Sequence, residues 1–344
     1  MPQQLEFGLD TFGDVTVDEN GNLLPQHQVL RNIVAEAELA DRLGIHFFGV
    51  GEHHRPDFAV SAPDVLLAAI AGRTQHIRLG SAVTVLSSED PVRVFQRFST
   101  LDAISNGRAE VIVGRGSFTE SFPLFGFNLD QYELLFEERL QLFTELLKEE
   151  PVTWQGSTRS GLKGQQIYPP TASGTLRTWV AVGGTPRSVL RAAHYGLPLM
   201  LAIIGGDPLG FRPLVELYNR ALAEAGKGPL PIGVHSPGYV ADTDDQAREE
   251  LFPHFAAMHA KIGQGRGWPP LSRASFEQLA GPSGALCAGA PETVAIKIAK
   301  TSKALGLSRF DMKYSAGTLP HGMMMRSIEL YATKVAPMVR ELLK

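Results

Sequence analysis

The fold is decided by residues 77–116, IRLGSAVTVLSSEDPVRVFQRFSTLDAISNGRAEVIVGRG. Residues 77–86 are rich in β-branched side chains and are predicted to form a buried strand. Asp90 then supplies an N-cap and Pro91 occupies the first helical position, so a helix is expected to begin there. A second apolar strand follows at 108–113. Continuous apolar strands separated by helices are typical of a parallel sheet covered by helices.

The same alternation of strand and helix extends along the chain in both directions. Further strands are expected at 5–9, 45–50, 178–182, 197–204, 231–240 and 309–314. The spacing of apolar residues predicts helices at 29–40, 63–73, 136–147, 188–195, 213–225, 244–262, 291–305 and 323–343. Strand–helix cycles with right-handed crossovers predict an α/β fold, an eight-stranded parallel TIM barrel. A doubly wound sheet is the alternative, although no Gly-x-Gly-x-x-Gly motif follows the first strand.

The chain has 344 residues and is expected to form one domain, residues 1–344. Barrels of ~250 residues often fold as one unit, and two rim segments account for the remainder. One is an insertion at 149–176, and the other is the Gly- and Pro-rich stretch 263–289, which is expected to be a long loop that acts as a lid. Cys287 lies in this stretch, and no base is evident beside it, so an unreactive thiol is expected.

Composition limits the classes of function that the chain could have. The formal net charge is −4, which argues against binding to nucleic acid or to an anionic membrane through a basic surface. The N-terminal residues do not resemble a signal peptide, and no apolar run approaches the ~20 residues that span a bilayer. The single cysteine excludes an internal disulfide and fits a cytoplasmic, reducing compartment.

Polar residues gather where the predicted strands end. Active sites of barrels of this kind lie at the carboxyl ends of the strands, so the candidate site is expected there. The segments concerned are Asp10-Thr11, Glu52-His53-His54-Arg55, Gly114-Arg115-Gly116-Ser117 and Gly183-Gly184-Thr185.

The turn after the predicted strand at 178–182 has the features of a phosphate site. Gly183 and Gly184 let a ligand approach the backbone, and the following helix offers free N–H groups. Thr185 and Ser188 add hydroxyl donors, and a nearby arginine, Arg115, would add positive charge. A threonine N-cap after a tight turn explains the same residues without a ligand.

The triplet Glu52-His53-His54 raises the question of a metal site. Successive side chains of a strand point to opposite faces, so the two histidines are not expected to bind one ion, and no metal is predicted. For His53, a role as acid or base or as a hydrogen-bonding partner of a cofactor is favoured. For His54, a structural hydrogen bond is favoured. A metal-dependent barrel hydrolase that uses both histidines is an alternative.

Several motifs follow one another in the order found in a known family. They are Glu52-His53-His54, residues 77–86, Asp90-Pro91-Val92-Arg93, Thr100-Leu101-Asp102, Ser105-Asn106-Gly107-Arg108, Gly114-Arg115-Gly116, Gly289-Ala290-Pro291-Glu292-Thr293-Val294 and Val335-Ala336-Pro337. With these motifs the chain resembles the bacterial luciferase-like flavin-dependent monooxygenases over nearly its whole length.

This resemblance implies a TIM barrel that binds FMN. Reduced FMN would serve as a co-substrate, and O₂ would be used to oxygenate a small organic substrate in a closed, apolar site. The resemblance implies NAD(P)H as the reductant, acting directly or through a separate flavin reductase. It also implies a homo-oligomer, either a dimer or a larger assembly.

The resemblance also assigns roles to residues of this sequence. It implies a non-prolyl cis peptide bond beneath the flavin ring at Ala82–Val83, a phosphate-binding arginine at Arg115, a phosphate loop at Gly184, Thr185 and Ser188, and a catalytic histidine at His53. Two departures predict a member that does not emit light. Gly184 stands where luciferase has an acidic residue, and Ile203 stands where luciferase has a tryptophan near the flavin.

Two further interpretations of the same motifs are alternatives. One is a deazaflavin-dependent hydride-transfer oxidoreductase of the same superfamily, whose cofactor reacts poorly with O₂. The other is a non-catalytic flavin-binding protein, which would bind FMN without oxidising a substrate.

Overall fold

Eight parallel strands close into a barrel in the computed structural model, which describes residues 4–264 and 266–344. They are β1 (Glu6–Thr11), β2 (Phe47–Val50), β3 (Arg78–Ser81), β5 (Ala109–Gly114), β8 (Arg177–Val182), β9 (Leu199–Ala202), β10 (Ile232–Val240) and β12 (Arg309–Lys313). Strand β12 pairs with both β1 and β10, and this pairing closes the sheet on itself. The predicted TIM barrel is therefore confirmed.

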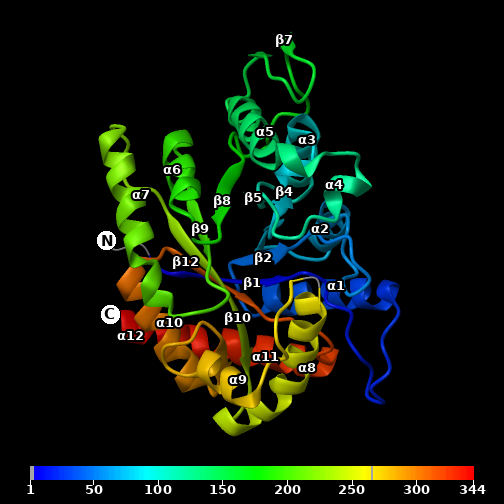
Figure 1. Cartoon of the computed structure of the whole chain (residues 1–344), viewed down its shortest axis with the longest axis vertical. Helices are drawn as coiled ribbons and strands as arrows, with labels where there is room; N and C mark the ends of the chain where they lie inside the picture. Colours follow the sequence, from blue (N-terminus) through cyan, green and yellow to red (C-terminus); the bar gives the residue numbers. More distant parts are fainter. Residues whose placement is uncertain (1–3, 265) are drawn as a thin grey trace.

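Helices surround the barrel strands (Figure 1). They are α1 (Gln26–Arg42), α2 (Pro63–Ala71), α3 (Pro91–Ile104), α5 (Tyr132–Leu146), α6 (Pro186–Tyr195), α7 (Arg212–Glu224), α8 (Asp244–Gln264), α10 (Pro291–Leu305), α11 (His321–Leu330) and α12 (Ala336–Leu343), with the short α4 (Ser121–Leu124) near α5. Asp90 caps α3 as predicted, because its carboxylate accepts hydrogen bonds from the backbone N–H groups of Val92 and Arg93. In the part of the chain that the structure describes, no helix combines the length and apolar character needed to cross a membrane.

Two predicted elements are interrupted. The strand expected at 77–86 divides into β3 and β4 (Thr84–Val85), and the Ala82–Val83 peptide bond between them is cis, as the resemblance implies. The last helix is divided by a π-helical turn at Tyr331–Val335.

The stretch 263–289 is less irregular than expected. It contains helix α9 (Arg273–Ala280) and strand β11 (Cys287–Gly289), which pairs with β10. The expectation of one long loop was therefore wrong, because apolar residues of α9 and β11 pack into the core despite the many glycines and prolines around them. Cys287 is buried, and this burial raises the pKa of its thiol to about 11. Gly265, at the beginning of the same stretch, lies outside the described residues.

The insertion at 149–176 contains a short antiparallel hairpin, β6 (Val152–Trp154) and β7 (Leu162–Gln165). Figure 1 shows this hairpin beyond α5, away from the barrel strands. Glu138 of α5 holds the adjoining loop, since its carboxylate accepts hydrogen bonds from the backbone and hydroxyl groups of Ser157 and Thr158.

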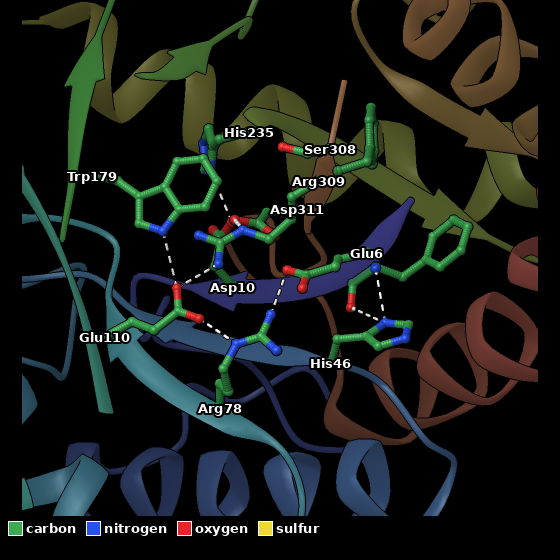
Figure 2. A network of polar contacts seen from close by, with 12 residues as sticks. Glu6, Asp10, His46, Arg78, Glu110, Trp179, His235, Ser308, Arg309 and Asp311 are labelled. Atoms are coloured by element: carbon green, nitrogen blue, oxygen red, sulfur yellow. Dashed lines mark hydrogen bonds and ion pairs between the residues drawn. The ribbon is translucent and has the colours of Figure 1, made fainter. Parts of the chain in front are cut away.

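Charged and aromatic side chains fill the barrel interior near the amino ends of the strands. Arg309 is fully buried between the rings of Phe47 and Trp179, with its guanidinium carbon 4.0 Å and 4.3 Å from the ring centres. It donates a hydrogen bond of 2.6 Å to Glu110, which also accepts one of 3.0 Å from the indole N–H of Trp179. Figure 2 shows this contact network, in which Arg78 reaches the other oxygen of Glu110. We call this layer the barrel floor.

A glycine leaves room for a polar side chain between the barrel floor and the carboxyl ends of the strands. Gly8 of β1 lies opposite Asp311 of β12, and a Cβ atom at this position would come within 2.0 Å of the Asp311 carboxylate. A side chain at Gly8 would therefore displace Asp311 from the barrel interior.

Replacing Arg309 with alanine would leave the buried Asp311 without its ion-pair partner, and would leave Glu110 paired only with arginines that are partly exposed. We expect the Arg309→Ala variant to lose about 3–5 kcal/mol of unfolding free energy, measured by urea denaturation. Arg326→Ala is the control, because Arg326 forms an exposed pair with Asp242 and should have little effect. Equal losses in the two variants would contradict a stabilising role for the Arg309–Glu110 pair.

Candidate active site

A cavity of about 310 Å³ lies at the carboxyl ends of the barrel strands. Of the eight residues predicted to be catalytic or to bind the cofactor, five line it together, namely His53, Ala82, Val83, Arg115 and Gly183. The other predicted phosphate residues, Gly184, Thr185 and Ser188, are not among the described residues that line the cavity. They follow Gly183 directly, at the beginning of α6.

The beginning of α6 is a turn with available backbone N–H groups. Gly184 has a φ of 117°, a conformation that glycine adopts without strain. Thr185 occupies the N-cap position, but its side chain does not cap the helix; its hydroxyl donates a hydrogen bond of 2.8 Å to Ser188 instead. The simple N-cap interpretation of Thr185 is therefore not supported. Pro186 has no N–H group and the N–H of Ser188 donates to the carbonyl oxygen of Thr185 at 3.0 Å, so the N–H of Arg187 is the one in the first turn that is left for an anion.

Arg115 lies in a small cluster of charges beside this turn. Its guanidinium contacts the carboxylate of Glu133, which also pairs with Arg191 at 3.0 Å and with Arg187 at 4.0 Å. Burial raises the pKa of Glu133, but the hydrogen bond from Arg191 and the charge of Arg115 lower it by more, so the net shift is downward. Arginines are thus concentrated where the sequence predicts phosphate, and Glu133 competes for them.

His53 is surrounded by aromatic rings at the edge of the cavity. Its ring centre lies 4.4 Å from that of Phe58, 4.8 Å from that of Phe12 and 4.8 Å from that of Phe118. Burial lowers the pKa of His53 to about 4, and the nearby charges of Asp14 and Lys313 have smaller, opposing effects. His53 is therefore neutral near pH 7 and is suited to accept a proton or a hydrogen bond.

His54 is part of a separate contact. Its Nε2 atom lies 2.9 Å from a carboxylate oxygen of Glu52, whose other oxygen accepts a hydrogen bond of 3.4 Å from the backbone of Val85. This contact supports the structural hydrogen bond expected for His54. Within residues 4–264 and 266–344, no group of three or more His, Cys, Asp or Glu side chains is arranged to hold a metal ion.

Ile203 does not occupy the position near the flavin that the resemblance implied. Its side chain is fully buried in the main apolar core, whereas its neighbours Ala202 and Ile204 line the cavity. The reason is the strand alternation, which turns every second side chain away from the barrel interior.

The sequence interpretation named Asp10 but missed two polar residues that line the cavity with it, His235 and Asp311. The Oδ2 atom of Asp10 lies 2.8 Å from Nδ1 of His235. Asp311 lies opposite His235 in the register of β12 and β10. Burial raises the pKa of Asp311 to about 7, with Arg309 lowering it and Asp10 raising it. The signal available for Asp311 was the polar residue at every second position of strand β12.

A barrel with such a cavity at its strand ends has the architecture of an enzyme active site. Sequence comparison then identifies the family. Residues 11–309 match the family model described as luciferase-like monooxygenase, and the chain belongs to this family. The resemblance drawn from the motifs is confirmed, and membership supports an oxidoreductase.

Relatives and solved structures agree with this assignment. Limonene 1,2-monooxygenase of Rhodococcus erythropolis is 28% identical over 70% of this chain and 65% of that protein. The first curated relatives are matched over 56%, 57% and 65% of their own lengths. The crystal structure of monooxygenase RslO1 from Streptomyces bottropensis superposes with a TM-score of 0.83 at 25% identity, covering 97% of this chain and 99% of that chain.

More distant structures show a likeness of fold alone. The oxygenating constituent of 3,6-diketocamphane monooxygenase from Pseudomonas putida, solved in complex with FMN, has a TM-score of 0.75 at 20% identity over 97% of this chain and 98% of that chain. An F420-dependent secondary alcohol dehydrogenase has a TM-score of 0.75 at 18% identity over 98% of this chain and 99% of that chain. The fold is therefore compatible with either cofactor.

The low pKa of His53 has a measurable consequence. Its imidazole resonances should not titrate above about pH 5 in NMR spectra.

The same pKa shift links His53 to stability. Between pH 6.5 and about 4 the unfolded chain binds a proton at this residue and the folded chain does not. Stability conferred through His53 is therefore complete above pH 6.5 and is lost as the pH falls toward 4. The His53→Gln variant should lack this part of the pH dependence in urea denaturation. A His53 resonance that titrates near pH 6.5 would contradict the effect of burial.

Proposed function

We propose that this protein is an FMN-dependent monooxygenase that uses reduced FMN and O₂ to oxygenate a small organic substrate. The observation that carries the proposal is that one cavity brings together His53, the cis peptide at Ala82–Val83 and Arg115. Family membership and the closed barrel support it. The reductant would be NAD(P)H, acting directly or through a separate flavin reductase.

The residues around the cavity fit a flavin mononucleotide. Arg115 and the first turn of α6 would hold the phosphate, with Gly183, Gly184, Thr185 and Ser188 supplying backbone and hydroxyl donors. Ala82 and other small residues of the lining, Gly114, Ala181 and Ala202, leave space for a flat ring system. Reduced FMN, when bound, supplies the electrons that activate O₂.

The protein side chains would perform the remaining tasks. The neutral imidazole of His53 is placed to accept a proton or a hydrogen bond at the edge of the cavity. The phenyl rings of Phe12, Phe58 and Phe118 shield this position from water. Their apolar character also favours an uncharged organic substrate.

We also propose a homo-oligomer and a covering role for part of the stretch 263–289. Val65 of α2 is 67% exposed and is available for contact with a second copy, whereas Leu66, Phe95 and Phe98 are buried within the chain. Near the cavity, Arg266 donates a hydrogen bond of 3.0 Å to the carbonyl oxygen of Ser117. This contact supports a segment that covers the site.

Removing the proposed phosphate contact should weaken the binding of FMN more than the binding of riboflavin. We expect Arg115→Ala to weaken FMN binding by about tenfold or more, because a charge-assisted hydrogen bond contributes ~1.5–3 kcal/mol, and to leave riboflavin binding nearly unchanged. Quenching of flavin fluorescence measures both affinities. Arg212→Ala is a matched control, since Arg212 pairs with Glu216 on an exposed face of α7. Equal weakening of FMN and riboflavin would reject phosphate contact by Arg115.

The reaction class is tested by mixing the protein with reduced FMN and then with air. We expect O₂ consumption with flavin re-oxidation, and oxygen incorporation from ¹⁸O₂ into substrates drawn from a panel of uncharged organic compounds. His53→Ala should still bind FMN but lose ~10²-fold in oxygenation. Binding of a deazaflavin without binding of FMN would favour the hydride-transfer alternative. FMN binding without any oxidised product would favour a flavin-binding protein.

A further inference from the structure

A second histidine lines the cavity in an environment unlike that of His53. The Nδ1 atom of His235 contacts the Asp10 carboxylate at 2.8 Å, and its ring stacks on Phe12 with 5.8 Å between the ring centres. The carboxylate fixes the orientation of the imidazole. Nε2 is then the nitrogen available to a molecule in the cavity, because Nδ1 is already engaged.

His235 lies beside a set of charged side chains that are largely buried in the barrel (Figure 2). Arg309 pairs with Asp311 at 3.1 Å and with Glu110 at 2.6 Å, and Asp311 lies opposite His235 across the β10–β12 pairing. Glu110 also pairs with Arg78 and Arg177, and both of these arginines contact Glu6. The set thus extends from the barrel floor to the cavity.

The charges in this set do not balance without one additional proton. Its carboxyl groups are Glu6, Asp10, Glu110 and Asp311, whereas its guanidinium groups are Arg78, Arg177 and Arg309. Four carboxylates against three guanidinium groups leave one negative charge. Glu6 and Arg177 reach solvent, whereas Asp10, Glu110, Asp311 and Arg309 are buried, and an uncompensated charge among them is costly. A proton on Asp311 or on His235 removes this charge.

The neighbouring ionisable groups do not supply the missing charge. Lys313 of β12 pairs with Asp14 at 3.0 Å, so these two neutralise each other. Tyr314 and Tyr331, which pack against the same strands, are neutral, because burial raises the pKa of each well above 10. The extra proton therefore belongs to the group formed by Asp10, His235 and Asp311.

Two oxygen atoms of this group are free to hold that proton. Asp10 Oδ1 and Asp311 Oδ1 are both buried and have no hydrogen-bond partner among the described residues. The raised pKa of Asp311, about 7, means that its carboxyl group exchanges a proton near neutrality. A carboxyl group that carries a proton can donate a hydrogen bond, so either oxygen is a position for the exchangeable proton.

We propose that Asp10, His235 and Asp311 hold one exchangeable proton, and that His235 donates it from Nε2 to the molecule bound in the cavity. The imidazolium of His235 becomes a neutral imidazole, the acceptor gains the proton, and a proton from water restores the group. Asp10 is a positioning residue, and Asp311 alternates with His235 as the site of the proton. The identity of the proton acceptor rests on the proposed function. The shared proton itself does not depend on it.

The division of roles between the two histidines follows from their surroundings. His53 is enclosed by three phenyl rings and stays neutral, so it acts as an acceptor. His235 is paired with a carboxylate and shares a proton with a second one, so it acts as a donor. Two titratable groups whose environments differ in this way are the usual arrangement for acid and base roles.

The shared proton is tested by NMR titration of the protein without flavin. In the wild type, the resonances of His235 and Asp311 should change together over one pH range, because the two groups share a proton. In Asp311→Asn the His235 resonance should titrate in one step and at lower pH, by about one unit or more, because a neighbouring negative charge has been removed. His194→Gln, at an exposed position on α6, is the control and should leave the His235 titration unchanged.

A second variant, His235→Gln, tests the same coupling through the carboxyl resonance of Asp311. It keeps the test valid if Asp311→Asn does not fold. In His235→Gln the proton can reside only on Asp311, so the carboxyl ¹³C resonance of Asp311 should titrate at a higher pH than in the wild type. Independent, unshifted titrations of His235 and Asp311 in all variants would overturn the proposal.

Flavin-dependent measurements separate this inference from the proposed function. His235→Gln should bind FMN as the wild type does, and its oxygenation rate should lose the dependence on pH that the wild type shows near neutrality. If the wild type does not bind FMN, the proposed function fails while the coupled titration still tests the shared proton. If His235→Gln keeps the wild-type pH profile, His235 does not donate the proton.

Discussion

The pairing of Arg309 with Glu110 inside the barrel is the interaction on which the rest of the structure depends. Both side chains are fully buried, and loss of either would leave the other with fewer opposing charges in a buried site. The rings of Phe47 and Trp179 enclose the guanidinium and fill the space around it. This layer is the barrel floor, and it fills the amino-terminal end of the barrel. The cavity is therefore confined to the carboxyl ends of the strands, where loops supply the remaining side chains.

The same buried charges connect the stability of the barrel to the chemistry of its cavity. Arg309 contacts Glu110 on one side and Asp311 on the other, and Asp311 belongs to the group that faces His235. A residue that holds the barrel together thereby also influences the protonation of a residue that lines the site. His53, which contacts aromatic rings instead, is independent of this network and stays neutral.

Much of the fold and part of the site followed from local patterns. The eight strands lie close to the predicted ranges, and the residues expected around the flavin, such as His53 and Arg115, line one cavity. The expectation of a long loop at 263–289 was wrong, because burial of α9 and β11 depends on neighbours distant in sequence. The same is true of the Glu133 carboxylate beside Arg115, which no pattern near Arg115 indicated.

Periodicity, capping residues and turn glycines were sufficient to predict a barrel of parallel strands and the end at which its site lies, because each reflects the preferences of adjacent residues. The grouping of Asp10, His235 and Asp311 was decided only when the barrel closed. Asp10 and His235 are 225 positions apart in the chain and meet through strand register around the sheet. Their protonation depends on burial and on opposing charges, and these are properties of the packed interior.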